Sequence, residues 1–134
     1  MSGPVSEGLA EWHALATAPD PERLARLVAE DAVFHSPVVH TPQEGRRLVV
    51  AYLSAAAATL GQGDFRYVRE LVDRQDVMLE FTCVLDDIQV NGVDIIRFND
   101  AGKIVDFKVM IRPIKAVNKV WEMMAAQLEK ASAS

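Results

Sequence analysis

The sequence predicts an α+β fold in which a cone-shaped, curved antiparallel sheet packs against helices, three before the main strands and one after them. Three observations support the element order ααβαββββα. Up to Leu60, apolar residues recur at spacings of three and four, as on the buried face of a helix. From Asp64 to Arg112 the apolar period is two, which is typical of strands. A helical period returns after Pro113.

The first two predicted helices are separated by Pro19. The first carries apolar residues on one face: Val5, Leu9, Trp12 and Ala16. The second begins after Asp20, whose carboxylate is suited to accept hydrogen bonds from the first amides of a helix, and Pro21 suits its first position. Its inner face is expected to contain Leu24, Leu27 and Val28. A short strand is predicted over Ala32–Ser36.

A loop bracketed by Pro37 and Pro42 leads to a third predicted helix over Gln43–Leu60. Its inward face is expected to contain Leu48, Val49, Tyr52, Leu53 and Ala56. The alanine run at 55–58 favours helix, and its short side chains make this side of the helix less bulky. Gly61 ends the helix, because glycine readily adopts the conformation found after a C-terminus.

The second half of the chain contains four predicted long strands: Phe65–Val72, Val77–Leu85, Ile88–Phe98 and Ile104–Arg112. Asn91-Gly92 is expected to kink the third strand, and Asn99–Lys103 to form a hairpin loop. The closing helix carries a single apolar stripe: Ile114, Val117, Trp121, Met124 and Leu128. Long strands interrupted by glycine curl, and a curled sheet with helices on one side leaves a hollow.

Composition and charge are those of one domain over residues 1–134, with a frayed tail expected at 131–134. The formal net charge is −5, and no Lys/Arg run exceeds Arg46-Arg47, which argues against nucleic acids and anionic membranes as partners. No signal peptide or stretch of transmembrane length is recognisable, so we expect a cytoplasmic protein. The single cysteine, Cys83, lies mid-strand and is expected to be a buried small hydrophobe.

Two segments carry a resemblance to a known superfamily. Leu27–Val38 contains the end of a helix, an acidic pair and a short strand before a proline. In Val93–Ile104 an acid begins a strand, and Arg-Phe-Asn leads to a Gly-Lys turn. Over roughly Trp12 to Leu128 the chain resembles the nuclear transport factor 2-like superfamily, which includes ketosteroid isomerase and the SnoaL-like polyketide cyclases. The resemblance implies a cystatin-like roll, a fold that hosts several kinds of enzyme as well as plain binders.

The resemblance to the isomerase implies particular site residues. In that enzyme an Asp base moves a proton, while a Tyr and a protonated Asp donate hydrogen bonds to the developing oxyanion. The protonated acid matches Asp94, which alternation places on one face with Ile96 and Phe98. The base matches Ser36, but serine alone is not a general base near pH 7. The adjacent His35 is the candidate base, although neighbours in a regular strand point to opposite faces.

Other assignments stay open at the level of sequence. Asp94 is alternatively the partner of a buried arginine, and His35 a structural histidine bonded to a backbone carbonyl. The tyrosine of the isomerase falls near Glu11 or Trp12, neither of which is a phenol, so Tyr52 or Tyr67 would have to supply one. Three histidines and one cysteine, scattered over helix, strand and loop, do not have the pattern of a zinc site, and we expect no metal and no cofactor.

A mostly apolar pocket is predicted, with these lining residues: Ser36, Tyr52, Phe81, Cys83, Ile96, Phe98, Phe107, Val109 and Trp12. Such a wall suits a small hydrophobic ligand with one or two polar groups. The alternative is that these side chains fill the hollow. The opposite sheet face mixes polar and apolar residues, which predicts a homodimer through that face.

The functional prediction is proton transfer on a small carbonyl compound, of the isomerase, cyclase or lyase kind, with Asp94 and His35 as catalytic residues. Two alternatives are a non-catalytic binder of a small apolar molecule and a dimeric interaction module. The base position occupied by Ser36 favours the first alternative, and the mixed sheet face favours the second.

Overall fold

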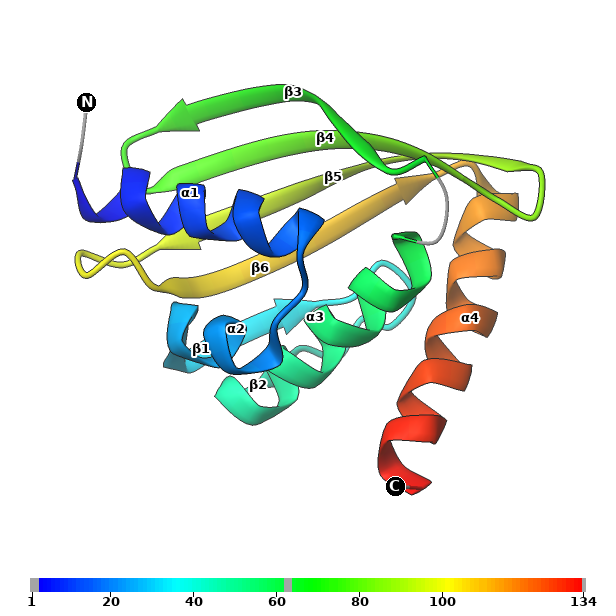
Figure 1. Ribbon diagram of the computed structural model, residues 1–134. Helices are drawn as coiled ribbons and strands as arrows, with labels where there is room; N and C mark the ends of the chain where they lie inside the picture. The colour runs from blue at the N-terminus through cyan, green and yellow to red at the C-terminus, as the bar shows by residue number, and fades with distance from the viewer. Residues whose placement is uncertain (1–2, 62–63, 134) are drawn as a thin grey trace.

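The computed structural model describes residues 3–61 and 64–133 and has the predicted α+β fold (Figure 1). The helices are α1 (Pro4–Thr17), α2 (Pro21–Leu27), α3 (Arg46–Leu60) and α4 (Ile114–Ala133). The strands are β1 (Val28–His35), β2 (Gln43–Glu44), β3 (Arg66–Asp73), β4 (Asp76–Leu85), β5 (Ile88–Phe98) and β6 (Ile104–Arg112). They form one curved sheet in the order β2-β1-β6-β5-β4-β3, with α1, α2 and α3 on its inner side.

Helix α2 begins as predicted, because the Asp20 carboxylate accepts hydrogen bonds from the amides of Glu22 and Arg23. Strand β1 begins earlier than predicted, at Val28, which directly follows the helix. Val28 is fully buried and pairs with Ile104 of β6, so packing against the sheet extends this strand. β1 and β6 run parallel, whereas the pairs β3–β4, β4–β5 and β5–β6 are antiparallel.

Helix α3 begins at Arg46 rather than at Gln43, because Gln43–Glu44 forms the short strand β2. β2 pairs antiparallel with Val33 and Phe34 of β1, and this pairing holds the chain extended. Gly45 joins β2 to α3 with a φ angle of 98°, a conformation that other residues rarely adopt.

The buried residues of helix α4 are Ala116, Val120 and Met124, of which Met124 belongs to the predicted stripe. Ile114 and Trp121, which were expected to face inward, are 76% and 56% exposed. The reason lies in the packing, because α4 lies mainly against α3 at one end of the sheet and not flat on the sheet (Figure 1). Sequence periodicity defines the stripes that a helix offers, and the neighbouring element decides which stripe is covered.

Helix α4 runs to Ala133, so residues 131–133 are helical where a frayed tail was expected, and residue 134 lies outside the described residues. Lys119 of this helix forms an ion pair with Asp86 in the turn between β4 and β5. Among the helices in the described part of the chain, none is long and apolar enough to cross a membrane.

The core lies between the inner face of the sheet and the helices, and it contains four fully buried phenylalanines: Phe34, Phe81, Phe98 and Phe107. Gly92 lies against the ring of Phe81, where any side chain would collide with that ring. The pairing of β4 with β5 continues past Gly92 without a register shift, so the kink predicted at Asn91-Gly92 is not a bulge. Glycine at this position instead makes room for the phenylalanine.

Candidate functional site

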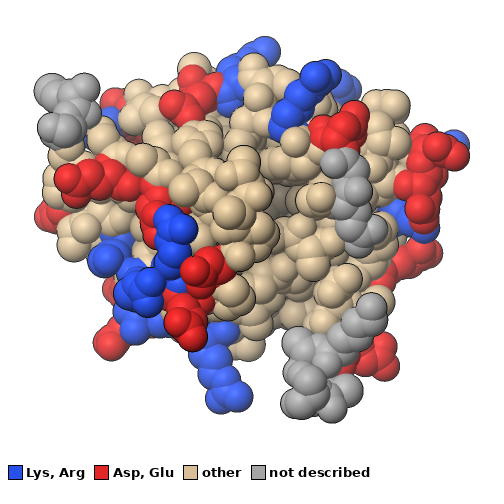
Figure 2. All heavy atoms as spheres, viewed as in Figure 1, with Lys and Arg blue, Asp and Glu red and all other residues tan. Residues whose placement is uncertain are grey.

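A cavity of about 420 Å³ lies between the inner face of the sheet and the helices. Its wall is mostly apolar and comes from α1, α2 and their linker, from α3, and from β3, β5 and β6. The lining residues are Trp12, Leu15, Ala16, Thr17, Pro19, Asp20, Pro21, Leu24, Leu53, Ser54, Ala56, Ala57, Ala58, Leu60, Gly61, Phe65, Tyr67, Asp94, Phe107 and Val109. Figure 2 shows a hollow surrounded mainly by uncharged residues on the face that it draws.

The alanine run of α3 makes one wall of this cavity. Ala56, Ala57 and Ala58 line it, between Leu53 and Leu60. Methyl side chains reach only a short way from the helix, so they leave space between α3 and the sheet. The thin helix surface that the sequence predicted is therefore one reason why this part of the interior is hollow.

Asp94 lies on the inner face of β5, between Leu79 of β4 and Val109 of β6. Its side chain lines the cavity, and the residue is only 5% exposed. The hydroxyl group of Tyr67 donates a hydrogen bond to its Oδ2 atom at 2.6 Å. Within the described part of the chain, Oδ1 has no hydrogen-bond partner, and it is not fully buried. Oδ1 is therefore the oxygen available to a molecule in the cavity.

Burial raises the pKa of Asp94 from 3.8 to about 7, and the hydrogen bond from Tyr67 partly opposes this rise. No cation contacts the carboxyl group within the described residues. The alternative that Asp94 pairs with a buried arginine is therefore wrong. Near neutral pH the neutral and ionised forms of Asp94 are both accessible, so the group can donate or accept a proton.

Tyr67 comes from β3 and connects Asp94 to helix α1. Its oxygen accepts a hydrogen bond from the indole Nε1 of Trp12 at 3.0 Å. Burial is the main cause that raises the pKa of Tyr67 well above its ordinary value, followed by the charge of Asp94 and the hydrogen bond to it. Trp12, Tyr67 and Asp94 thus form one hydrogen-bonded chain along the cavity wall, with Tyr67 as a neutral phenol.

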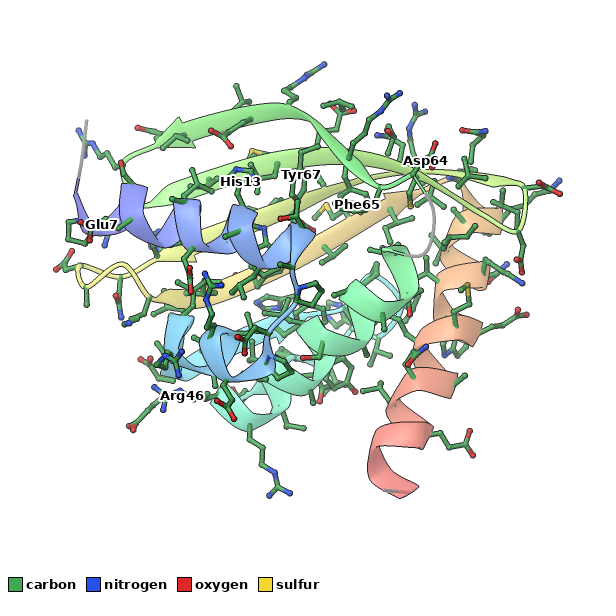
Figure 3. All side chains as sticks on the ribbon, in the orientation of Figure 1. Glu7, His13, Arg46, Asp64, Phe65 and Tyr67 are labelled. Carbon is green, nitrogen blue, oxygen red and sulfur yellow. The ribbon has the colours of Figure 1, made fainter. Side chains whose placement is uncertain are left out.

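Aromatic contacts hold this chain in place. The indole of Trp12 packs on Phe107 with ring centroids 4.9 Å apart, and Tyr67 makes an edge contact with Phe65 at 5.1 Å. His13 touches the other side of Tyr67, and its Nε2 atom lies 2.7 Å from Oε1 of Glu70 on β3. Figure 3 shows Tyr67 extending from the strand toward α1, next to His13. Consecutive residues of α1 therefore attach this helix to β3.

His35 and Ser36 lie outside the lining of this cavity. The inner-face residue of this stretch of β1 is the buried Phe34, so His35 points to the outer face, where its Nε2 lies 2.9 Å from Oδ1 of Asp106. The hydroxyl group of Ser36 accepts a hydrogen bond from the amide of Val38 and so stabilises the turn after β1. His35 and Asp94 thus lie on opposite faces of the sheet.

The other predicted pocket residues divide into two groups. Trp12, Phe107 and Val109 line the cavity, together with Asp94. The rest lie in the packed interior outside the lining: Phe81, Cys83, Ile96, Phe98 and the half-buried Tyr52. Along β4 and β5, packed side chains therefore lie on both sides of Asp94, and only part of the inner face borders the cavity.

The cysteine and the histidines provide no further site. Burial, and secondarily the charge of Asp64, raises the pKa of the Cys83 thiol to about 11, which makes it a poor nucleophile. Within residues 3–61 and 64–133, no three His, Cys, Asp or Glu residues come together in a way that could hold a metal ion.

Sequence reasoning missed several parts of the cavity. Phe65 and the linker between α1 and α2 were not predicted to line it, and Tyr67 was only one of two candidate phenols. The alternation of β3 could have placed Phe65 and Tyr67 on one face. No local signal places the linker, because its position depends on how α1 and α2 pack.

Comparisons with known proteins agree with this fold. The model of the SnoaL-like domain family matches residues 9–107. A steroid delta-isomerase from Pseudomonas aeruginosa superposes with a TM-score of 0.93 at 37% identity, over 100% of this chain and 98% of that one. An uncharacterised bacterial protein with a cystatin-like fold from Silicibacter pomeroyi gives a TM-score of 0.83 at 32% identity, over 90% and 84%. A protein of unknown function from Mesorhizobium loti shares the NTF2-like fold, with a TM-score of 0.70 at 24% identity over 82% and 92%. No curated protein matches.

Proposed function

The chain belongs to the SnoaL-like domain family, with the ketosteroid isomerase-like fold, and we propose that its cavity binds a small hydrophobic carbonyl compound on which Asp94 transfers a proton. The observation that carries this proposal is the buried carboxyl group of Asp94, with one oxygen free, in the wall of a mostly apolar cavity. A volume of about 420 Å³ lies within the range of roughly 300–1,000 Å³ that is usual for small-molecule sites.

The environment of Asp94 supports proton transfer at neutral pH. A general acid or base works best when its pKa lies near the working pH, and burial raises the pKa of Asp94 to about 7. Asp20, the other carboxylate in the lining, is engaged as the N-cap of α2. Ser36 and His35 lie outside the lining, so in this proposal Asp94 takes the place of a separate base.

The proposed step conserves atoms and charge. Ionised Asp94 takes a proton from the carbon next to the ligand carbonyl, and the electrons of the broken C–H bond form an enolate. The neutral Asp94 then returns the same proton to another carbon of the conjugated system, which restores both the carbonyl and the carboxylate. Tyr67 stabilises the carboxylate before and after the transfer by its hydrogen bond to Oδ2.

The relative from Pseudomonas aeruginosa supports the same reading. Its name states isomerisation of a steroid, which is an apolar substrate, and its sequence is 37% identical over the whole of this chain. The second candidate function is binding without catalysis. Ser36, which matches the base of the isomerase in sequence, stabilises a turn outside the cavity. This position favours binding without catalysis.

A panel of β,γ-unsaturated ketones tests the proposal, with conjugation of the enone followed by ultraviolet absorbance. We expect turnover by the wild type, and a loss of about 10²–10⁴-fold in kcat/KM for Asp94→Asn. Asp106→Asn, which removes a carboxylate from the outer face, is the matched control and should keep full activity. Thermal shifts with the same ketones but no turnover would contradict catalysis and support binding without catalysis. No thermal shift and no turnover would contradict both functions.

A further inference from the structure

The lining of the cavity has a buried floor and an exposed mouth. Asp94 and Val109 of the sheet lie at the floor, and each is 5% exposed. The mouth lies between the end of α1, the linker to α2 and the last turn of α3, where Thr17, Pro21 and Ala57 are exposed to solvent. A ligand that reaches Asp94 from solvent therefore passes the residues of the mouth, and a long ligand stays in contact with them.

The polar side chains of the lining fall into two groups that match the floor and the mouth. Those of the floor form the hydrogen-bonded chain that ends at Asp94. Those of the mouth are Thr17 of α1, Asp20 of the linker and Ser54, which lies one turn before the exposed Ala57 on α3. All other described residues of the lining are apolar or glycine. The cavity thus offers hydrogen bonds at two separate places.

The mouth offers mainly hydrogen-bond acceptors. Asp20 uses Oδ1 for both of its bonds to amides of α2, at 3.1 and 3.2 Å, and its Oδ2 has no hydrogen-bond partner within the described residues. The Thr17 hydroxyl donates to the carbonyl oxygen of Ala14 at 3.1 Å, so its remaining capacity is that of an acceptor. The Ser54 hydroxyl can donate or accept. A hydrogen-bond donor on the ligand suits this end of the cavity best.

We propose that the cavity selects neutral hydroxy ketones, with the carbonyl end at Asp94 and the hydroxyl group donating a hydrogen bond to Oδ2 of Asp20 at the mouth. This inference rests on the proposed function, which supplies the carbonyl end of the ligand. A hydrogen bond to a carboxylate is stronger than one between neutral groups. A carboxylate on the ligand would instead meet the like charge of Asp20, and no Lys or Arg is among the described residues of the lining.

The Asp20 carboxylate is held in place before any ligand arrives. Its two bonds to the amides of α2 fix the orientation of the side chain. On either side of the linker, Arg23 of α2 donates to Glu11 of α1 at 3.0 Å, which ties the two helices together and leaves this arginine engaged outside the lining. A fixed acceptor loses little conformational freedom when it binds a hydroxyl group, so Asp20 is suited to determine specificity.

Two series of aryl ketones test this inference. Each molecule carries an acetyl group at one end and a hydroxymethyl, methoxymethyl or carboxylate group at the other, on a short para-substituted benzene or a longer 2,6-substituted naphthalene. Isothermal titration calorimetry at about pH 7 measures their affinities. In at least one series we expect the hydroxymethyl ketone to bind about tenfold more tightly than the methoxymethyl ketone, which has no donor, and the carboxylate to bind most weakly.

Asp20→Asn reverses the polarity of the mouth and keeps the helix cap, because Asn caps a helix as well as Asp does. The amide oxygen then accepts the bonds from α2, and the amide N–H group replaces Oδ2. We expect the preference for hydroxymethyl over methoxymethyl to shrink at least about fivefold and the affinity for the carboxylate to rise. Glu22→Gln is the matched control, since it removes an exposed carboxylate from the same helix outside the lining, and it should keep the wild-type preference.

The outcomes separate the two proposals. Deuterium exchange at the acetyl methyl group, followed by proton NMR in heavy water, measures proton transfer by Asp94 independently of the preference at the mouth. A hydroxymethyl preference without exchange would refute the proton transfer and support the role of Asp20. Exchange without a preference in either series, or a preference that Asp20→Asn retains, would refute the role of Asp20 alone. If no ketone binds, both proposals are wrong. Should Asp20→Asn fail to fold, Asp20→Ser carries the same test, since serine also caps a helix.

Discussion

The two faces of the sheet provide opposite environments for a carboxyl group. On the outer face, Glu80 of β4 lies 3.2 Å from the Arg69 guanidinium and accepts a hydrogen bond from Asn91. On the inner face, Asp94 of the neighbouring strand has, among residues 3–61 and 64–133, the neutral hydroxyl of Tyr67 as its sole hydrogen-bond partner. The outer carboxylate is paired with a cation and is partly exposed, whereas no cation among the described residues lies beside the inner one, and its pKa rises to about 7 because of burial.

This difference teaches that the environment gives a carboxyl group its role. Glu80 belongs to a polar row that crosses the outer face, in which Arg112 donates to Asn91 and Asn91 donates to Glu80. Asp94 lies among Leu79, Val109 and aromatic rings, where a charge is costly. Four predictions test this contrast between the faces.

The largest effect is expected from the aromatic support of the inner face. Phe107 is fully buried and packs on both Trp12 and Phe34. Phe107→Ala should lower the free energy of unfolding by about 3–5 kcal/mol in urea denaturation. Met110→Ala, on the outer face of the same strand at 52% exposure, should change it by about 0.5 kcal/mol or less. Equal losses would contradict the assignment of the two faces.

The second prediction concerns the pH dependence of stability. The pKa of Asp94 is raised on folding, so its contribution to stability is complete below about pH 4 and is lost as the pH rises to about 7. Asp94→Asn cannot ionise. Its free energy of unfolding should therefore increase relative to that of the wild type by about 1.4 kcal/mol per pH unit across this window. Urea denaturation at several pH values measures the difference, with Glu80→Gln as the control for loss of a paired carboxylate on the outer face. A difference that does not grow with pH would count against a buried, weakly solvated Asp94.

The third prediction concerns the outer face. Its apolar centre includes Leu71 and Met110, exposed by 56% and 52%, and its rim carries charges of both signs. We propose that a second copy of the chain covers this face, since such a patch can match itself about a two-fold axis. Met110→Lys should then raise the dimer Kd at least about tenfold in analytical ultracentrifugation. Trp121→Lys on α4 is the control, and a wild type that stays monomeric at every concentration would refute the proposal.

The smallest effect is expected at His35. Its ring nitrogen contacts Asp106 on the outer face, half-exposed to water, so His35→Gln should change the free energy of unfolding by about 1 kcal/mol or less. Ketone binding and turnover should stay within about twofold of the wild type. A large loss of turnover would instead show that the outer face takes part in the reaction.

The sequence by itself determined the four helices, the long strands β3 to β6 and their order, and the faces of β4, β5 and β6, but not the short strand β2. The period of two predicted β4, β5 and β6 closely, and it placed Asp94 on the same face as Ile96 and Phe98, as the structure has it. Those features depend on contacts within one element and on the geometry of one strand, which a short stretch of chain already specifies.

Only the tertiary structure decided which part of the inner face is hollow and which groups meet there. The Trp12–Tyr67–Asp94 chain joins α1, β3 and β5, and no local pattern sets the distances between those elements. The same holds for the start of β1 at Val28 and for the exposure of Trp121, which depend on the neighbours that pack against them. Alternation fixes the side of a sheet on which a residue lies, but packing between distant segments fixes what that residue contacts.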